Sequence, residues 1–92
     1  MRITFDPRAI DDLDNIFAWI ATDSPRAAYD MIVRIEERIS RLAVPGLAHM
    51  GRPGLVGRTR ELVAKPYIVV YKVAEEDDEI IVLGIVHGAQ DR

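Results

Sequence analysis

Three short apolar runs in the second half of the sequence constrain the fold of this chain more than any other feature. They are rich in β-branched and aromatic residues, and they cover residues 61–64, 67–73 and 80–86. Turn signals separate them: Lys65-Pro66 lies between the first two runs, and the acidic stretch 75–78 lies between the last two. Runs of this length and composition are typical of β-strands. The pattern therefore predicts a small antiparallel sheet with short connections.

Two sequence signals for a helix N-terminus lie in the first half of the sequence. In Asp6-Pro7 and Ser24-Pro25, a side chain that can accept backbone hydrogen bonds precedes a proline, which needs no such bond at the first helical position. Apolar residues then recur at helical spacing, and the first helix should end near Thr22. Because the link between the two segments is very short, we expect an antiparallel helical hairpin. The apolar positions are Ile10, Leu13, Ile16, Phe17 and Ile20, then Ala28, Ile32, Ile35, Ile39 and Leu42.

The remaining segments complete the expected fold. Ile3-Thr4-Phe5 is a candidate edge strand, and glycines and prolines punctuate residues 43–58, where no regular element is expected. That loop should make a tight turn and present Arg52. The order β-α-α-β-β-β predicts a single α+β domain over residues 1–92, with the N-terminal helical hairpin packed on one face of the antiparallel sheet.

Composition narrows the class of protein. An apolar share of 49% in 92 residues indicates a folded domain, and the sequence shows neither a long apolar stretch nor a signal-peptide core. Without cysteine, disulfides and thiolate metal ligands are excluded, and two scattered histidines cannot form a metal site alone. We expect a cytoplasmic domain with no cofactor and no bound metal.

Charge is distributed unevenly along the chain. The net charge is −3, whereas residues 43–72 carry five basic side chains against Glu61 alone, and residues 73–92 are strongly acidic. Nucleic-acid binders are usually basic as a whole, so only the central segment resembles one. Its basic residues are either ordinary solvated charges or a contact surface for a target or a phosphate. The candidates are Arg52, Arg58, Arg60, Lys65 and Lys72.

Residues 57–90 carry three phrases that resemble one protein family. Arg60-Glu61-Leu62, Tyr67-Ile68-Val69-Val70-Tyr71 and His87-Gly88-Ala89 are similar to the strands of RelE/ParE toxins from bacterial type II toxin–antitoxin systems. The resemblance implies the fold predicted above, and a toxin that is neutralised by a cognate antitoxin encoded beside it. The family contains ribonucleases that cut mRNA on the ribosome, and also ParE-like plasmid-stabilisation toxins that block DNA gyrase without enzymatic activity.

A metal-independent ribonuclease needs a base, an acid and cations around the scissile phosphate. Glu61, Arg60 and His87 are the candidates, because a carboxylate can accept a proton and histidine titrates near neutrality. The resemblance argues against this use. Where ribonucleases of the family carry a phosphate-binding arginine, this chain has Ile68, and residues 88–92 do not match the catalytic Tyr or Arg that follows the last strand in those enzymes. Enzymatic activity stays open, and the sequence favours a non-enzymatic toxin.

The same side chains also have purely structural interpretations. His87 can be a hydrogen-bonded strand end, Glu61 can pair with a basic residue across the sheet, and His49 can be an exposed loop residue. Along the middle strand, side chains alternate between the two faces of the sheet. Alternation puts Tyr67, Val69 and Tyr71 on one face, where the tyrosines pack, and Ile68, Val70 and Lys72 on the other.

The favoured function is a ParE-like toxin that inhibits DNA gyrase and is neutralised by its antitoxin. Trp19, Ile16 and Ile20 are the candidate antitoxin contacts, although core packing is the main expectation for Trp19. One alternative is a RelE-like, ribosome-dependent mRNA endoribonuclease. The other is a homologue that binds the antitoxin but is not toxic.

Overall fold

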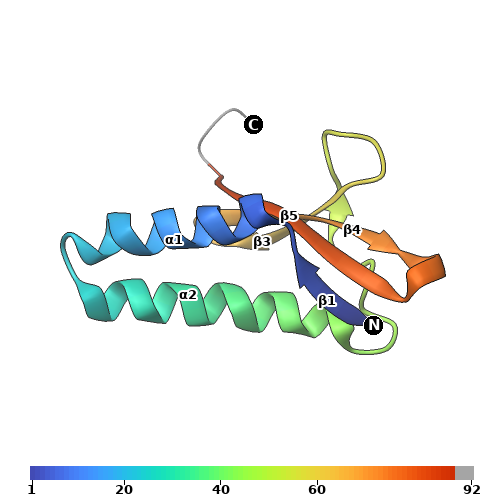
Figure 1. The fold of residues 1–92 in the computed structure, drawn as a ribbon, viewed down its shortest axis with the longest axis horizontal. Helices are drawn as coiled ribbons and strands as arrows, with labels where there is room; N and C mark the ends of the chain where they lie inside the picture. Colours follow the sequence, from blue (N-terminus) through green and yellow to red (C-terminus); the bar gives the residue numbers. More distant parts are fainter. Residues whose placement is uncertain (89–92) are drawn as a thin grey trace.

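The computed structural model describes residues 1–88 and contains two helices and a five-stranded sheet (Figure 1). Two short 3-10 turns follow α2 and β4, at Arg41–Ala43 and Glu75–Asp77. The strand order in the sheet is β1-β5-β4-β3-β2. The elements are β1 (Arg2–Phe5), α1 (Pro7–Ala21), α2 (Pro25–Ser40), β2 (Arg52–Pro53), β3 (Arg60–Ala64), β4 (Tyr67–Ala74) and β5 (Glu79–His87).

The predicted α+β class is confirmed, but the sheet is mixed instead of antiparallel. Strands β2 to β5 are antiparallel neighbours, whereas β1 pairs with β5 in parallel. A parallel pair requires a long crossover connection, and here the helical hairpin and the other three strands lie between β1 and β5 along the chain. A second correction concerns the loop over residues 43–58, which was expected to hold no regular element. The short edge strand β2 lies inside it, and Pro53 is tolerated at that edge position.

The helical hairpin forms as the two start signals predict. The Asp6 carboxylate accepts a hydrogen bond from the Arg8 N–H at 3.0 Å, and the Ser24 hydroxyl accepts one from the Ala27 N–H at 3.1 Å. The first helix ends at Ala21, next to the expected boundary at Thr22. The two helices run side by side in opposite directions, and their turn projects beyond the strands (Figure 1).

The hydrophobic core lies between the hairpin and one face of the sheet. Tyr67, Val69 and Tyr71 belong to this core, which confirms the predicted alternation along β4 and the packing role of both tyrosines. Burial of one aliphatic side chain, such as that of Val69, contributes about 1.5–3 kcal/mol to the free energy of folding. The helices supply Ala9, Ile16, Ile35 and Ile39, and the other strands supply Leu62, Ala64, Ile80, Val82 and Ile85.

A bulge in β5 lies next to the place where α1 contacts this strand. Val70 pairs with Gly84 and Tyr71 pairs with Val82, so Leu83 is an extra residue in β5. Strand β1 pairs with β5 only as far as Val82, and α1 runs beside β5 beyond that point. There the Asp12 carboxylate accepts a hydrogen bond of 2.9 Å from the Ile85 N–H. A Cβ at Gly84 would lie 3.1 Å from this carboxylate, so the small residue lets α1 approach.

Candidate functional site

The structure does not bring the three ribonuclease candidates together. Arg60 pairs with Tyr71, so its side chain starts on the face that carries the core, whereas the neighbouring Glu61 starts on the opposite face. His87 pairs with Tyr67, at the other end of β4. Tyr71 lies four positions after Tyr67 along the strand, which corresponds to about 13 Å at roughly 3.3 Å per residue. The three side chains therefore start from different faces or from opposite ends of the sheet.

Glu61 is held in a structural ion pair. Its side chain is 4% exposed, and Oε1 lies 3.3 Å from Nη2 of Arg52. These two residues are direct cross-strand partners in β2 and β3. The predicted pairing across the sheet is therefore confirmed. The Arg52 side chain is 57% exposed, so the loop still presents it while it pairs with Glu61.

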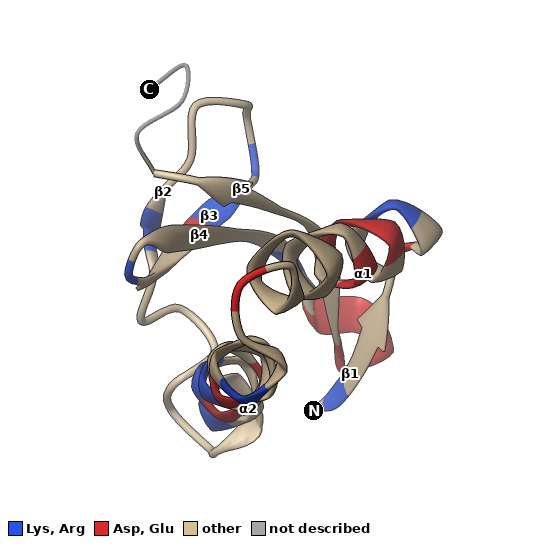
Figure 2. Ribbon diagram, turned by 90° about the vertical axis from the view of Figure 1, so that its left-hand side faces the viewer, with Lys and Arg blue, Asp and Glu red and all other residues tan. Residues whose placement is uncertain are grey.

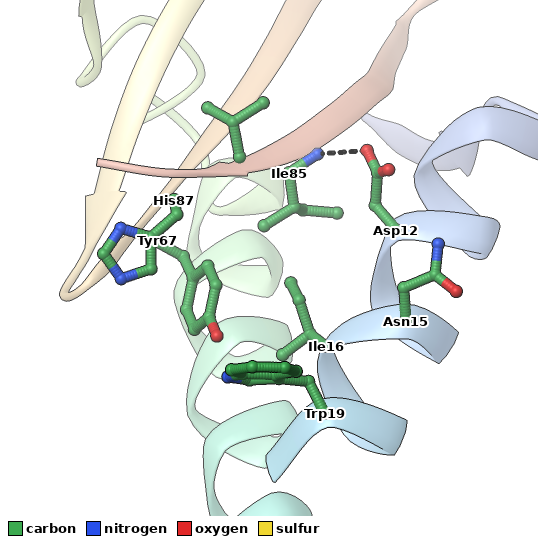
Figure 3. Close-up of a pocket in the computed structure, with 8 residues that line it drawn as sticks. Asp12, Asn15, Ile16, Trp19, Tyr67, Ile85 and His87 are labelled. Carbon is green, nitrogen blue, oxygen red and sulfur yellow. Dashed lines mark hydrogen bonds between the residues drawn. The ribbon is translucent and has the colours of Figure 1, made fainter. Parts of the chain in front are cut away.

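His87 lies in a groove beside the first helix. Its ring packs edge-on against Tyr67, with centroids 5.4 Å apart and ring planes at 78°. The groove has a volume of about 440 Å³ and runs between α1 and the ends of β4 and β5 (Figure 3). Its chemistry is mixed, with three aromatic rings, those of Trp19, Tyr67 and His87, beside a carboxylate and an amide. The lining residues are Asp12, Asn15, Ile16, Trp19, Tyr67, Ile85, Val86 and His87.

The candidate antitoxin contacts occupy different environments. Trp19 is 78% exposed, so the expected core packing is wrong. It lies near the C-terminal end of α1, and its indole borders the groove beside Tyr67 and Ile16 (Figure 3). Ile16 is buried and lines the groove, whereas Ile20 packs against the hydrophobic core. Trp19 and Ile16 therefore share the groove, and Ile20 is not part of its lining.

Further exposed apolar residues were not singled out from the sequence. Tyr29 of α2 is 62% exposed, and its position just off the apolar stripe of that helix was the signal that could have identified it. Ile10 and Phe17 belong to the predicted stripe of α1, but they are 48% and 40% exposed. Both line a second groove of about 380 Å³ between the two helices and β1.

The five candidate cations do not converge on one point. Lys65 lies in the β3–β4 turn, and Lys72 is exposed on β4, on the face away from the core. Arg60 donates a hydrogen bond through Nη2 to the carbonyl of Gly51. Arg58 and Arg60 line one pocket, which has a volume of about 330 Å³ and is also lined by His49, Pro53, Thr59 and Val73. His49 is exposed, as expected, and its Nε2 lies 2.8 Å from Glu75 Oε1.

The loop between β2 and β3 presents aliphatic side chains. Leu55 is 74% exposed and Val56 is 70% exposed, a feature that the sequence interpretation missed. The Gly54 N–H donates to the Thr59 carbonyl at 2.8 Å, and the Thr59 N–H donates to the Val56 carbonyl at 3.1 Å. Two adjacent aliphatic residues between Gly54 and Gly57 were the available signal, because a glycine-bounded turn has little core to cover them.

Residues 1–88 contain no group of three or more His, Cys, Asp or Glu side chains that could hold a metal ion. In the same part of the chain, no helix is long and apolar enough to cross a membrane. The expectation about a catalytic residue after the last strand falls on residues 89–92, outside the described part of the chain.

Sequence and fold are both similar to those of known toxins. Residues 3–92 match the family described as the ParE toxin of type II toxin–antitoxin system, parDE. The toxin candidate Y4kP of Sinorhizobium fredii is 36% identical over 91 residues, which cover 97% of this chain and 90% of that protein. A chain from the chromosomal ParDE system of P. aeruginosa superposes with a TM-score of 0.82 at 26% identity and covers 95% of both chains.

RelE toxins are more distant. The isolated E. coli RelE toxin has a TM-score of 0.68 at 11% identity, and the match covers 99% of this chain and 87% of RelE. At that identity the likeness shows the fold alone. The match to the ParE family, in contrast, covers the chain from residue 3 to its last residue, and the similar ParDE chain shares the arrangement of helices and strands. The chain belongs to the ParE toxin family of type II toxin–antitoxin systems.

Proposed function

We propose that this chain is a ParE-like toxin that acts in the cytoplasm by inhibiting DNA gyrase, without cleaving RNA. The observation that carries the proposal is the separation of Arg60, Glu61 and His87, which face different sides or lie at different ends of the sheet. Cleavage of a phosphodiester requires preorganised cations and proton donors within hydrogen-bond distance of one phosphate. The family assignment supports the same conclusion.

The sheet face away from the helices supports this proposal from a second direction. On that face, Ile68 stands directly beside Val63 on β3 and Val86 on β5. Aliphatic side chains cannot stabilise the charge that develops on a phosphate during cleavage. The ion pair of Arg52 and Glu61 lies near the β2 edge of the same face, and its cation is already neutralised.

The groove beside α1 supports binding of an antitoxin. A disordered antitoxin segment that folds on binding gains most from a surface with exposed aromatic side chains and a few polar groups. Trp19 offers such an anchor, Ile16 forms part of the apolar wall, and Asp12 and Asn15 offer polar groups. Growth rescue by the product of a short neighbouring open reading frame, with co-purification of the two proteins, tests this part.

The activity is tested with the purified chain in two parallel assays. In the first, gyrase supercoils relaxed plasmid in the presence of increasing toxin, and we expect supercoiling to be inhibited. In the second, translating ribosomes receive the toxin, and we expect transcripts without new ends. New transcript ends with unaffected gyrase would establish the ribonuclease instead. Tight antitoxin binding with no growth defect on induction would identify a non-toxic homologue.

A further inference from the structure

The loop between β2 and β3 exposes apolar surface that folding does not explain. Among residues 1–88, Leu55 and Val56 are the only exposed large apolar residues that are adjacent in the chain. The loop projects from the sheet, away from the turn of the helical hairpin (Figure 1). Isolated exposed aliphatic residues are common on proteins, whereas paired ones at a projecting tip are typical of contact surfaces.

Hydrogen bonds to the Tyr71 hydroxyl anchor the chain just before this loop. The Tyr71 hydroxyl accepts a hydrogen bond from the Gly51 N–H at 3.1 Å and donates one to the Ala48 carbonyl at 2.9 Å. The loop closes so tightly that a Cβ at Gly54 would collide with the Thr59 side chain. A preorganised loop loses little conformational entropy on binding, so its apolar contacts translate more fully into affinity.

The base of the loop is cationic. Arg58 and Arg60 line the pocket of about 330 Å³, together with Thr59 and His49. Arg58 has a φ of 67°, a left-handed conformation that a non-glycine residue adopts at an energetic cost. In the part of the chain that the structure describes, the Nε atom of Arg60 is buried without a hydrogen-bond partner. A carboxylate entering the pocket would pair with the exposed Arg58 and would lie beside the positive charge of Arg60, whose Nη2 also donates to the Gly51 carbonyl.

We propose that residues 51–60 form the surface that binds the toxin's protein target. Leu55 and Val56 enter an apolar depression of the target, and an acidic side chain from its rim enters the pocket and pairs with Arg58 and Arg60. The identity of the target as gyrase rests on the function proposed above, but the assignment of the loop does not.

The chemistry of the loop favours a protein over DNA as its partner. Duplex DNA is bound mainly through phosphate contacts, and the proteins that do so are usually basic as a whole. This chain has a net charge of −3, and the projecting part of the loop is aliphatic. Figure 2 shows basic residues on β2, β3 and the neighbouring loop, whereas acidic residues lie along α1 and the β4–β5 connection. An apolar tip with two arginines at its base matches an apolar depression with an acidic rim.

The test compares a double variant, Leu55→Ser with Val56→Ser, with a control variant, Val44→Ser. Val44 is 49% exposed and lies outside this loop, so both changes remove exposed apolar surface. We expect the double variant to lose growth arrest on induction and to need roughly 30-fold more protein to inhibit supercoiling. Arg58→Ala should weaken inhibition about tenfold, whereas Arg26→Ala, at an exposed arginine of α2, should not. Urea unfolding should show both loop variants as stable as the wild type.

The outcomes separate this inference from the assignment of gyrase. If the wild type arrests growth without affecting supercoiling, the gyrase proposal fails. The proposal that the loop binds the target is then tested by growth arrest alone. A double variant that arrests growth like the wild type overturns the inference. Binding of the wild type to a linear DNA duplex without gyrase, lost in the double variant, also overturns it and identifies DNA as the partner. A wild type with neither effect overturns both proposals.

Discussion

Two exposed regions of this molecule differ in almost every physical property. The groove beside α1 rests on a rigid helix, and it combines the aromatic side chain of Trp19 with the carboxylate of Asp12. The loop at residues 51–60 is a short connection whose tip is aliphatic and whose base is cationic. Because the groove and the loop differ in the sign of their charged groups and in their shape, they suit different partners. If the groove binds the antitoxin and the loop binds the target, as proposed above, mutations should alter the two binding events separately.

The toxin is small compared with an ordinary protein interface. The molecule measures 42 × 25 × 21 Å. A protein interface of standard size covers about 800 Å² on each partner. Under the two proposals above, an antitoxin bound over the groove beside α1 would occupy much of the neighbouring space and would exclude a large target from the loop by steric hindrance.

The largest expected effect comes from a change that damages both regions. Ile35 is fully buried in the core that supports α1, α2 and the sheet. Ile35→Ala should lower the free energy of unfolding by about 2–5 kcal/mol and reduce antitoxin binding and toxicity together. Urea denaturation followed by circular dichroism measures the loss. A change below about 1 kcal/mol would show that the hairpin does not depend on this core contact.

A smaller effect should separate the loop from the groove. In Tyr71→Phe, the Gly51 N–H and the Ala48 carbonyl lose their shared partner, so stability should fall by about 1–3 kcal/mol. We expect weaker inhibition of the target with unchanged antitoxin affinity, measured by supercoiling assays and calorimetry. Tyr29→Phe serves as the control, because Tyr29 is exposed on α2. Equal losses at both binding surfaces would contradict the separation.

The reciprocal change concerns Asp12 at the wall of the groove. Asp12→Ala removes the acceptor for the Ile85 N–H and should cost about 1 kcal/mol of stability. Asp12→Asn keeps an acceptor oxygen and should recover most of the loss. Antitoxin affinity should fall in the alanine variant while inhibition of the target persists. Identical unfolding curves for the two variants would show that the contact with β5 is unimportant.

The smallest effect on stability is expected at Trp19. Because the indole is 78% exposed, Trp19→Ala should change the free energy of unfolding by less than about 0.5 kcal/mol. Antitoxin affinity should nevertheless fall at least about tenfold if the indole anchors the partner. Calorimetric titration of the antitoxin into both proteins measures this. Unchanged affinity would remove Trp19 from the antitoxin interface.

Local signals in the sequence predicted most of the fold, and long-range relations account for what was missed. The Asp6 and Ser24 caps and the three apolar runs gave the helices and the main strands, because caps, propensities and alternation act over a few residues. Such local signals could not predict that β1 pairs with β5 in parallel, since the direction of pairing depends on the path of the whole chain. Alternation along β3 could have shown that Arg60 and Glu61 face opposite sides.

The exposed residues were harder to foresee. Trp19 borders the helical apolar pattern, but its indole is 78% exposed at the edge of the groove, which depends on how α1 is placed beside β4 and β5. Leu55 and Val56 lie in a loop in which no periodic pattern marks a buried side. The family resemblance gave the class of toxin, whereas the separation of the two surfaces depends on the position of each element in three dimensions.

Hydrogen–deuterium exchange of the toxin bound to gyrase tests the separation of the two surfaces most directly. Exchange is followed at the Gly54 and Thr59 amides, which hold the loop closed, and at the Ile85 amide, which is bonded to Asp12. We predict that gyrase slows exchange at the loop amides and leaves Ile85 unchanged, and that the antitoxin does the reverse. Protection of Ile85 by gyrase, with loop amides that exchange as in the free toxin, would contradict the account.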